Sequence, residues 1–488
     1  MFTSTAFASI LPEILILVLG ILLLIVEPFW KEEQRRNVGW LTAGGLLIAM
    51  VISFLFGQPG EPTTTLGGMV RFDWLGFFFK MLFMFAGAVT ALLLMDNEKV
   101  GHRGEAYLLM LTSLIGMNLM ASAADLIMLY LAIETTSIPL YVLSGFMLAD
   151  EKSTEAGFKY LLFGALTSSV MLYGFSLLFG FAGTTNIYDL AGKLQAGNLS
   201  PIVAFGVLSL ILVGIGFKVS IVPFHFWAPD VYEGAPTPVA GFLSTASKAA
   251  GFAVLVRLFF VAFPNFAASW TLVLAILSAV TMTIGNLLAL PQTNIKRLLA
   301  FSSISHAGYV MIGVIAFSSK LTVPQLGAAS VVFYLAAYIL TNLLAFGIVM
   351  AYSRVTGLED IKDYSGLSRR SPWLALMMLA AFLSLAGMPP FGGFVAKVFV
   401  FAAGVQAGYV WLVIMGIINS IIGVYYYLNV LKYVYLYRTS DQDEENHPIP
   451  LTRPYIIALA VLVIGVILIG TVFAPWFSWS NAGALNLF

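Results

Sequence analysis

The sequence predicts an all-α polytopic membrane protein with about 14 transmembrane helices, including two inverted five-helix repeats that each contain a broken helix. The first observation is composition: of 488 residues, 60% are hydrophobic and 10% are charged, a balance that would give a soluble protein an apolar surface. The second is length, since about 14 hydrophobic segments reach the roughly 20 residues that cross a bilayer. The third is that prolines interrupt two of these segments close to a lysine.

The hydrophobic segments follow one another along the whole chain. We expect spans at 5–27, 38–57, 73–95, 106–122, 125–149, 156–182, 201–227, 237–262, 269–290, 299–317, 326–353, 373–403, 406–436 and 454–478. No basic segment precedes the apolar run Ile10–Val26 and no small-residue cleavage site follows it, which favours a retained first helix over a signal peptide. The segments 326–353 and 373–403 are long, so we expect them to be tilted or broken.

Basic residues between the spans predict the orientation. The loops after odd-numbered spans carry 15 of the 24 Lys and Arg residues, namely Lys31, Arg35, Arg36, Lys99, Arg103, Lys152, Lys296, Arg297, Arg354, Lys362, Arg369, Arg370, Lys432, Arg438 and Arg453. The loops after even-numbered spans carry Arg71, Lys193 and Lys320. By the positive-inside rule the odd-numbered loops are cytoplasmic, and both termini face outward.

The remaining basic residues lie inside the spans or at their edges, where a central charge costs about 2.5–3.5 kcal/mol or more. They are Lys80, Lys159, Lys218, Lys248, Arg257 and Lys397. Lys80 and Arg257 lie near helix ends, and we expect their long side chains to reach the membrane interface. Lys159 is similarly placed, and a functional role is as plausible for it. We interpret Glu13, in the first span, as an interfacial or packing residue.

A helix break is predicted beside Lys218. Pro223 has no N–H, and its ring displaces the carbonyl of Val219 four residues earlier. Carbonyls freed at such a break can hold water. His225, whose side chain is suited to titration near neutral pH, follows directly. We interpret this stretch as part of a proton or cation path.

A second break is predicted before Lys397, where Gly387–Gly393 holds two prolines and three glycines inside an apolar segment. Glu134 precedes Lys218 by 84 residues, and His306 precedes Lys397 by 91, which suggests a duplication. Units of five helices must enter the membrane from opposite sides. We therefore divide the chain into helices 1–3 (1–105), a first repeat (106–262), a second, inverted repeat (263–436) and a C-terminal loop and helix (437–488).

Three further polar residues lie in the middle of spans. Glu134 could stay ionised beside a buried lysine, each controlling the proton affinity of the other; the alternative is a structural hydrogen bond between helices. Lys248 is preceded one turn earlier by Ser244, and a lysine removed from water can be a reversible proton carrier; the alternative is permanent pairing with a carboxylate. His306, with Ser302 one turn earlier, would alone be interpreted as a packing residue, but the buried lysines make it a relay candidate.

Composition also excludes some chemistry. The chain has no cysteine, so disulfides, thiol catalysis and cysteine-ligated iron–sulfur clusters are excluded. The formal net charge is zero, which gives no indication of a nucleic-acid partner.

Several motifs resemble the antiporter-like membrane subunits of proton-pumping NADH:quinone oxidoreductase, respiratory complex I. They are Gly216-Phe217-Lys218, Pro223-Phe224-His225, Trp227-Ala228-Pro229-Asp230-Val231-Tyr232-Glu233-Gly234-Ala235-Pro236, Ser247-Lys248, Gln292-Thr293-Asn294-Ile295-Lys296-Arg297 and Ser302-Ser303-Ile304-Ser305-His306. The same family includes subunits of sodium/proton antiporters and membrane-bound hydrogenases.

Within this family the chain is most similar to the N-type subunits. The run Glu134-Thr135-Thr136-Ser137-Ile138-Pro139-Leu140-Tyr141-Val142-Leu143 is similar to their fifth helix. Lys397 stands where the M type carries a glutamate. The chain ends soon after the fourteenth span, so we expect none of the lateral helix of the L type.

The resemblance implies a proton-translocating subunit of an NADH:quinone oxidoreductase, with no cofactor of its own. Protons would enter from the cytoplasmic side, pass Lys218 and Lys248 and leave through Lys397, with Glu134 as a switch. The resemblance also assigns proton-path positions to His225, His306 and Lys159. FMN, iron–sulfur clusters and quinone would belong to partner subunits. The expected partners are other complex I membrane subunits, including the M type and small membrane subunits, in a bacterial inner membrane or an equivalent energy-coupling membrane.

Two alternatives remain open on the sequence. The chain could belong to a cation/proton antiporter or a membrane-bound hydrogenase, which would use the same lysines. It could also be a structural spacer, although a spacer would not need three lysines in hydrocarbon.

Overall fold

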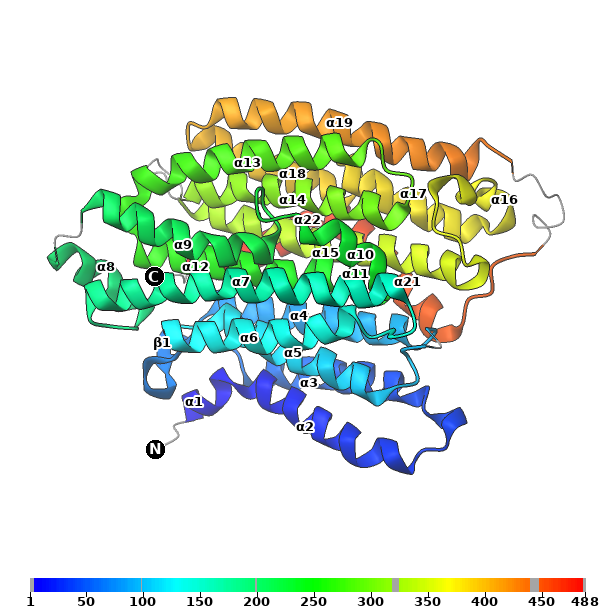
Figure 1. Ribbon diagram of the computed structural model, residues 1–488, viewed down its shortest axis with the longest axis horizontal. Helices are drawn as coiled ribbons and strands as arrows, with labels where there is room; N and C mark the ends of the chain where they lie inside the picture. Colours follow the sequence, from blue (N-terminus) through cyan, green and yellow to red (C-terminus); the bar gives the residue numbers. More distant parts are fainter. Residues whose placement is uncertain (1–3, 98, 198–199, 318–323, 439–446, 486–488) are drawn as a thin grey trace.

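The structure is a computed structural model that describes residues 4–97, 99–197, 200–317, 324–438 and 447–485. Most helices run side by side along one axis (Figure 1). Within the described residues, thirteen helices are long and apolar enough to cross a membrane, and two shorter apolar helices, Pro372–Ala386 and Gly392–Gln406, follow each other where the twelfth span was predicted. The prediction of an all-α polytopic membrane protein with about 14 spans is confirmed.

The first part of the chain runs to the end of the predicted eighth span. In chain order its elements are α1 (Ser4–Ser9), α2 (Leu11–Val26), short 3-10 turns at Glu27–Phe29 and Glu32–Gln34, α3 (Asn37–Phe56), β1 (Thr63–Thr65), a 3-10 turn at Leu66–Gly68, β2 (Val70–Phe72), α4 (Trp74–Leu94), α5 (Gly104–Ser122), α6 (Leu126–Ser144), α7 (Glu151–Ala182), α8 (Ile187–Ala196), α9 (Pro201–Val219), α10 (Trp227–Gly234), α11 (Thr237–Phe242), a π turn (Leu243–Ser247) and α12 (Lys248–Ala262). The strands β1 and β2 form an antiparallel hairpin that pairs Thr63 with Phe72.

The second part begins with a 3-10 turn at Pro264–Phe266. It continues with α13 (Ala267–Ala289), α14 (Ile295–Phe317), α15 (Pro324–Thr356), a 3-10 turn (Ile361–Tyr364), α16 (Leu367–Arg370), α17 (Pro372–Ala386), α18 (Gly392–Gln406), α19 (Val410–Tyr435), α21 (Arg453–Thr471) and α22 (Phe473–Leu485). Of the two long predicted segments, 326–353 lies in one uninterrupted helix, α15, whereas 373–403 is broken. The last predicted span is also divided, since α21 ends at Thr471 and α22 packs back against α15 and α4.

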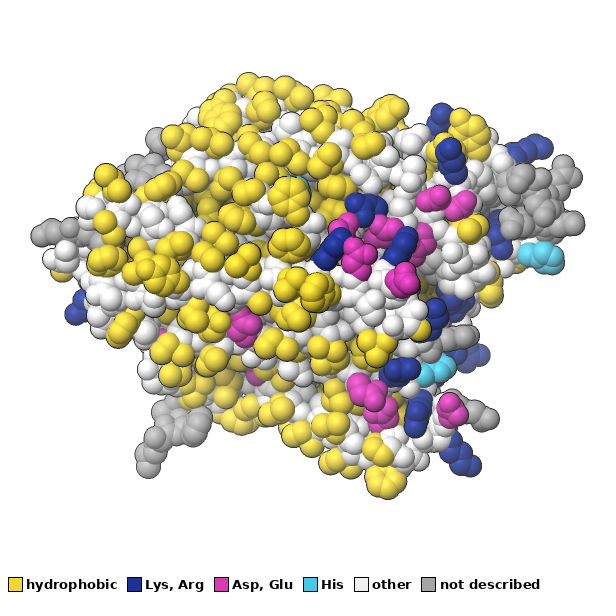
Figure 2. Space-filling view, viewed as in Figure 1, with side chains coloured by type: hydrophobic (Ala, Val, Ile, Leu, Met, Phe, Trp, Pro, Cys, Tyr) yellow, Lys and Arg dark blue, Asp and Glu magenta, His cyan; other side chains and the backbone are white. Residues whose placement is uncertain are grey.

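Charged side chains gather at one end of the helices, the right-hand end in Figure 2. We call this end, which holds the loops after odd-numbered spans, the basic end. We call the opposite end, where α1 and α8 lie in Figure 1, the terminal end. Lys320 lies outside the described residues. The arrangement agrees with the predicted number of spans, and which end faces the cytoplasm stays a prediction.

Asp96 connects four segments of the chain at the basic end. Its side chain is 5% exposed and accepts hydrogen bonds from Arg36, from Arg354 Nη1 at 2.6 Å and from Thr452 Oγ1 at 2.6 Å. These contacts join the loop after α4 to the start of α3, to the end of α15 and to the residue before α21. Charge-assisted bonds of this kind hold distant spans in register at the membrane surface.

The predicted break beside Lys218 is confirmed. Helix α9 ends at Val219, and Ser220 has the left-handed φ of 60° that stops a helix. Residues 221–226 are not helical before α10 begins. The freed Phe217 carbonyl accepts a hydrogen bond from Trp227 Nε1 at 3.1 Å, and the Val222 N–H donates to Thr281 Oγ1 of α13 at 3.1 Å. The break is thus held by side chains as well as by Pro223.

The second break is also confirmed. Helix α17 ends at Ala386, Gly387 has a φ of 83°, and α18 begins at Gly392. A glycine suits this position because a Cβ there would lie 2.7 Å from Lys397 Cδ and because L side chains rarely adopt that φ. A Cβ on Gly393 would lie 1.9 Å from the Ser384 carbonyl oxygen, so the two half-helices meet only because this residue has no side chain.

Candidate functional site

The site is built around two interior spans. All of the residues in the most apolar windows of Thr237–Ala262 and Ile295–Ala316 are buried inside the protein. The first span carries Lys248, and the second carries Ser303 and His306. Because lipid and bulk water are excluded from both spans, other parts of the protein must satisfy their polar atoms.

Lys218 and Glu134 lie on neighbouring helices but do not form an ion pair among the described residues. Lys218 is 6% exposed, and its Nζ donates to Ser137 Oγ of α6 at 2.8 Å. Ser137 is nearly one turn after Glu134, which lies within electrostatic reach of the lysine. Glu134 itself accepts a hydrogen bond from Ser168 of α7. The predicted contact between the fifth and seventh spans is confirmed, and a direct or one-water Glu134–Lys218 contact in another state stays a prediction.

Lys248 binds Ser303 of α14 rather than a carboxylate. It is 2% exposed, and its Nζ donates to the Ser303 carbonyl oxygen at 2.9 Å and to Ser303 Oγ at 2.5 Å. A π turn, Leu243–Ser247, comes directly before it. Such turns interrupt the helical ladder and are frequent at functional sites. The sequence analysis missed this turn, for which the small residues Ser244–Ser247 gave only a weak signal.

His306 lies between two tyrosines. Its Nδ1 is 2.6 Å from Tyr334 Oη, and its Nε2 is 3.3 Å from Tyr427 Oη. Tyr427 also shares a hydrogen bond with Ser302. The imidazole is 4% exposed and has a hydroxyl partner on each nitrogen, as a proton relay would require.

Lys397 is held by the second break. Its Nζ donates to the Ala386 carbonyl at 3.0 Å, to the Leu385 carbonyl at 3.2 Å and to Ser420 Oγ at 2.8 Å. It also lies 5.0 Å from the centre of the Tyr309 ring, a cation–π contact. The two carbonyls belong to the last turn of α17, so the freed backbone groups solvate this charge directly. At the first break the lysine amine is bound by the Ser137 hydroxyl and not by a backbone carbonyl.

Helix α14 connects the two halves of the site. Ser303 binds Lys248, His306 follows three residues later, and the Tyr309 ring contacts Lys397 after a further three. At about 1.5 Å per residue, this polar stretch covers about 9 Å of buried helix. One helix therefore links the lysine of the eighth span with that of the twelfth.

Two candidate residues lie apart from these contacts. Lys159 is about one-third exposed and pairs with Glu155 at 2.6 Å and with Asp230 at 2.5 Å. It belongs to an ion-pair network rather than to the buried centre. His225 is 3% exposed, and its Nδ1 has no hydrogen-bond partner among the described side chains and backbone.

The predicted positions of Lys80 and Arg257 at the membrane interface are wrong. Lys80 is 3% exposed, and its Nζ lies 2.7 Å from Glu13 Oε1. Arg257 is 2% exposed and forms a two-pronged ion pair with Asp73, with distances of 2.7 and 2.9 Å. Carboxylates from distant helices neutralise both cations, so neither has to reach water. Glu13 is accordingly a buried ion-pair partner.

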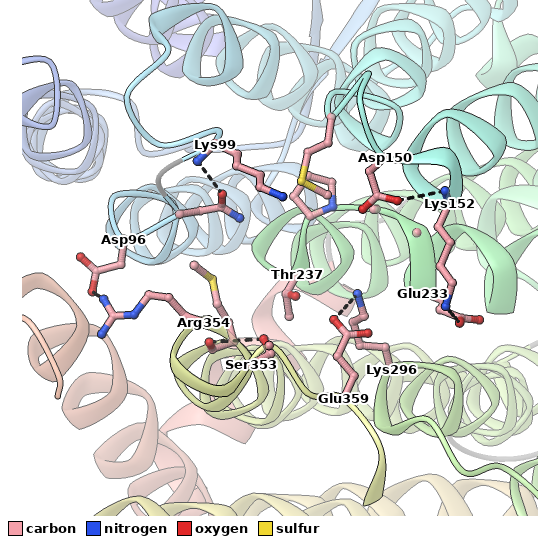
Figure 3. Close-up of a pocket in the computed structure, with 17 residues that line it drawn as sticks. Asp96, Lys99, Asp150, Lys152, Glu233, Thr237, Lys296, Ser353, Arg354 and Glu359 are labelled. Carbon is pink, nitrogen blue, oxygen red and sulfur yellow. Dashed lines mark hydrogen bonds and ion pairs between the residues drawn. The ribbon is translucent and has the colours of Figure 1, made fainter. Parts of the chain in front are cut away.

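A cavity of about 490 Å³ opens at the basic end (Figure 3). Its lining includes Thr237, which begins α11, and two ion pairs, Lys296–Glu359 and Lys152–Glu233, each at 2.8 Å. Burial raises the pKa of the Glu233 carboxyl, but hydrogen bonds from Lys152 and Arg297 outweigh it and bring that pKa below its ordinary value. Glu233 is therefore negatively charged at neutral pH, in the wall of the cavity.

Polar groups continue inward from this cavity. Asn342 Nδ2 of α15 donates to Ser244 Oγ at 2.6 Å, in the π turn before Lys248, while Asn342 Oδ1 has no protein partner among the described residues. The Tyr232 and Tyr338 hydroxyls are buried and have no hydrogen-bond partner among the described residues. A buried polar atom without a protein partner usually marks a water position.

Sequence reasoning missed the hydroxyl groups that hold the charged residues. Ser137, Ser168, Ser303, Ser420, Tyr334 and Tyr427 each contact a predicted site residue from another helix. Serines and tyrosines are common in membrane helices, so only their placement reveals the role. Among the described residues, no group of three or more His, Cys, Asp or Glu side chains could hold a metal ion.

Known proteins of one family match this chain over nearly its whole length. The family model described as NADH:quinone oxidoreductase/Mrp antiporter, TM, matches residues 123–423. NADH-quinone oxidoreductase subunit N of Moorella thermoacetica is 41% identical over 478 residues, 98% of each chain. The protein of the same name from Heliobacterium modesticaldum is 40% identical over 486 residues, which cover 99% of this chain and 100% of its own.

Solved structures share the fold. A chain of respiratory complex I from Thermus thermophilus with bound aureothin matches with a TM-score of 0.78 and 31% identity, covering 97% of this chain and 100% of that one. A chain of the Mrp complex from Dietzia sp. DQ12-45-1b matches with a TM-score of 0.81 and 21% identity, covering 99% and 98%. At that lower identity the likeness shows the fold alone.

Proposed function

The chain belongs to the NADH:quinone oxidoreductase/Mrp antiporter family of membrane subunits, and on that premise we propose that Lys218, Lys248 and Lys397 form its proton path. Its likeness over nearly the full chain to subunit N makes it a proton-pumping, antiporter-like subunit of NADH-quinone oxidoreductase, a translocase. FMN, iron–sulfur clusters and quinone are proposed for the partner subunits. Those partners would include the M-type subunit and small membrane subunits.

The observation that carries the proposal is the polar face of α14. It joins Lys248, through Ser303, to His306 and then to the Tyr309 ring beside Lys397. A structural spacer would not need such groups in its driest part, where each unpaired polar atom is costly. We propose that protons cross from the first to the second repeat along this face.

We propose that protons enter through the cavity at the basic end, which would face the cytoplasm. Thr237 in the cavity wall precedes Lys248 by 11 residues, about 16 Å of helix. Ser244 and Asn342 lie between them, and Asn342 Oδ1 has no hydrogen-bond partner among the described residues, so it could accept a hydrogen bond from a water. Both termini would then lie on the outer side of a bacterial inner membrane or its equivalent.

Glu134 is proposed to be the switch. Opposite charges at about 4 Å and an effective dielectric near 20 attract by about 4 kcal/mol, enough to load or unload a lysine. In this structure the Glu134 carboxylate is bound by Ser168 and the Lys218 amine by Ser137. A rotation that exchanges these hydroxyl partners for a direct pair would change the proton affinity of Lys218. His225 and Lys159 are proposed as outlying members of the same path.

We further propose that residues 106–262 and 263–436 are the two inverted repeats. The support is that each unit contains one broken span with a lysine close to the break. Lys218 lies in the last turn of α9, directly before the first break, and Lys397 lies in the second turn of α18, after the second break. An inverted repeat would place the two breaks on opposite membrane faces of the same path.

The proposal is tested by Lys218→Ala. We expect NADH-driven proton pumping to fall about tenfold or more in membranes with fully assembled complex, because a positioned proton donor commonly contributes at least that factor. Lys362→Ala, at an exposed lysine of the basic end, is the matched control and should pump normally. Normal proton-to-electron stoichiometry in the Lys218 variant would refute the path.

The uptake cavity is tested by Glu233→Gln. Removing a fixed negative charge should lower the local proton concentration, so we expect about two- to fivefold slower pumping at pH 8 and a smaller deficit at pH 6. Glu32→Gln, an exposed acid at the same end outside the cavity, is the control. An equal deficit at both pH values would indicate a structural defect instead of slower uptake.

Of the earlier alternatives, the complex I subunit is favoured over the antiporter. The full-length relatives at about 40% identity are named for NADH-quinone oxidoreductase. The Mrp likeness, at 21% identity, extends to the fold alone.

A further inference from the structure

Toward the terminal end, α2, α4 and α12 hold two buried ion pairs that the proton path does not use. Lys80 of α4 pairs with Glu13 of α2, and Arg257 of α12 pairs with Asp73 at the start of α4. All four residues are at most 6% exposed. Buried ion pairs often contribute little net stability, so their presence here calls for another explanation.

Arg257 is fixed from several sides. In addition to Asp73, its Nε donates to the Ala121 carbonyl of α5 at 3.0 Å, and its Nη1 donates to the Tyr188 hydroxyl of α8 at 2.5 Å. Arg71 of β2 lies over the Tyr188 ring at 4.4 Å. An arginine guanidinium stays protonated in proteins, so Arg257 cannot itself pass a proton onward.

These pairs lie beyond Lys248 on the way to the terminal end. Arg257 follows Lys248 by nine residues on α12, about 14 Å of helix. The residues between them are glycine and apolar side chains that are at most 2% exposed. The Lys218 side chain lies against Gly251 of α12, and a proton moving outward beyond it along α12 would next meet Arg257 and Asp73.

A small space connects the two pairs. A cavity of about 10 Å³ is lined by Ser9, Arg71, Asp73, Lys80 and Ser122, among others, and a space of about this size can hold a single water. Lys80 Nζ also donates to the Ser9 carbonyl at 2.7 Å, and Glu13 Oε2 has no hydrogen-bond partner among the described residues. A water in this space would lie between Asp73 and Lys80, and Lys80 in turn contacts Glu13.

We propose that Arg257 and Lys80 seal the first repeat against the outer side. Each cation holds a buried carboxylate, Asp73 or Glu13, in an ion pair, so that neither carboxylate is free to carry a proton outward from Lys248. The proton at Lys248 must then cross to Lys397 instead of leaking out directly. This inference rests on the proposed path through Lys248, and it assigns a function to two cations outside that path.

The seal predicts opposite results for the two partners of one ion pair. Among the described cations, Arg257→Gln leaves Asp73 with only Arg71, whose Nε lies 4.0 Å from Asp73 Oδ2, so Asp73 should accept protons more readily. Passive proton leak should then rise roughly tenfold, the factor that one unit charge produces at about 10 Å in an effective dielectric near 20. Asp73→Asn should not leak, because it removes the carboxylate and keeps the cation. In the double variant Arg257→Gln/Asp73→Asn the passive proton leak should return to the wild-type rate.

The measurement uses proteoliposomes with the assembled complex and no NADH. A potassium diffusion potential drives protons, and a trapped pH dye reports their passage per complex. Equal leak in Arg257→Gln and Asp73→Asn, or a double variant as leaky as Arg257→Gln, would overturn the seal, since both results indicate loosened packing. No leak in Arg257→Gln would overturn it as well.

A second set of variants guards against failed assembly at Arg257. Lys80→Met should leak, whereas Glu13→Gln and Lys80→Met/Glu13→Gln should not. Adding Lys248→Ala to Arg257→Gln should abolish the leak, and a leak that persists would refute a seal on the Lys248 route. The proposed proton path is tested separately, by NADH-driven pumping in Lys218→Ala, so either idea can fail alone.

Discussion

Replacing Lys248 with alanine is expected to reduce proton pumping about tenfold or more in fully assembled complex. The ammonium group is the only link between α12 and Ser303 that the described residues show at this point. Its loss removes a proton carrier from a span with no access to lipid or bulk water. Pumping is measured by dye quenching in inverted membrane vesicles during NADH oxidation, normalised to the amount of complex.

Two further variants separate the carrier role of Lys248 from a structural role. Lys248→Arg keeps a cation and hydrogen-bond donors near Ser303 but cannot release its proton. We expect it to assemble well and to pump as poorly as Lys248→Ala. If Lys248→Arg pumps normally, the lysine is a structural partner of Ser303, and the relay is wrong. Lys193→Ala, at an exposed lysine of the terminal end, should behave as wild type.

Lys397→Ala is the second change with a large expected effect. The amine is surrounded by the Leu385 and Ala386 carbonyls, Ser420 Oγ and the Tyr309 ring. Without it the second break loses the one lysine that the described residues place there, so we expect about tenfold or more slower pumping. Because the two carbonyls also lose their donor, we expect the variant to be less stable, as an unsatisfied buried carbonyl costs about 1–3 kcal/mol.

Ser420→Ala provides a graded control for Lys397. It removes one hydrogen bond from the amine and leaves the two carbonyls in place. We expect pumping to fall by only about two- to tenfold, in line with a net loss of about 0.5–1.5 kcal/mol. Pumping and thermal stability should be measured together. A Lys397→Ala complex that is unstable and yet pumps at the normal rate would contradict the assigned role.

Several features of the fold could be predicted because they depend on local properties of the chain. Hydrophobic length determines the number of spans, and Pro223 and Pro389-Pro390 determine where two of them break. The location of Lys218, Lys248 and Lys397 within apolar spans was also evident, since a charge inside a long apolar run is conspicuous in any sequence. The π turn before Lys248 was missed, because residues 243–247 contain neither proline nor glycine.

The positions of Lys80 and Arg257 show where local reasoning fails. Both lie near helix ends, and in an isolated helix their side chains would extend to the interface. In the folded chain other helices enclose them and supply carboxylates. The partner of Arg257 is 184 residues away in the sequence. No periodicity or spacing within α12 could have indicated it.

The sequence by itself determined the class of protein, the number of spans, their two breaks and the buried basic residues. Those properties follow from the cost of placing apolar groups in water and charged or proline residues in a lipid-exposed helix, and each depends on neighbouring residues only. The tertiary structure alone decided the partners: Ser137 for Lys218, Ser303 for Lys248, two backbone carbonyls for Lys397 and carboxylates for Lys80 and Arg257. A buried charge must be satisfied by whatever polar group packing brings within about 3 Å, and packing joins residues that are far apart in the chain.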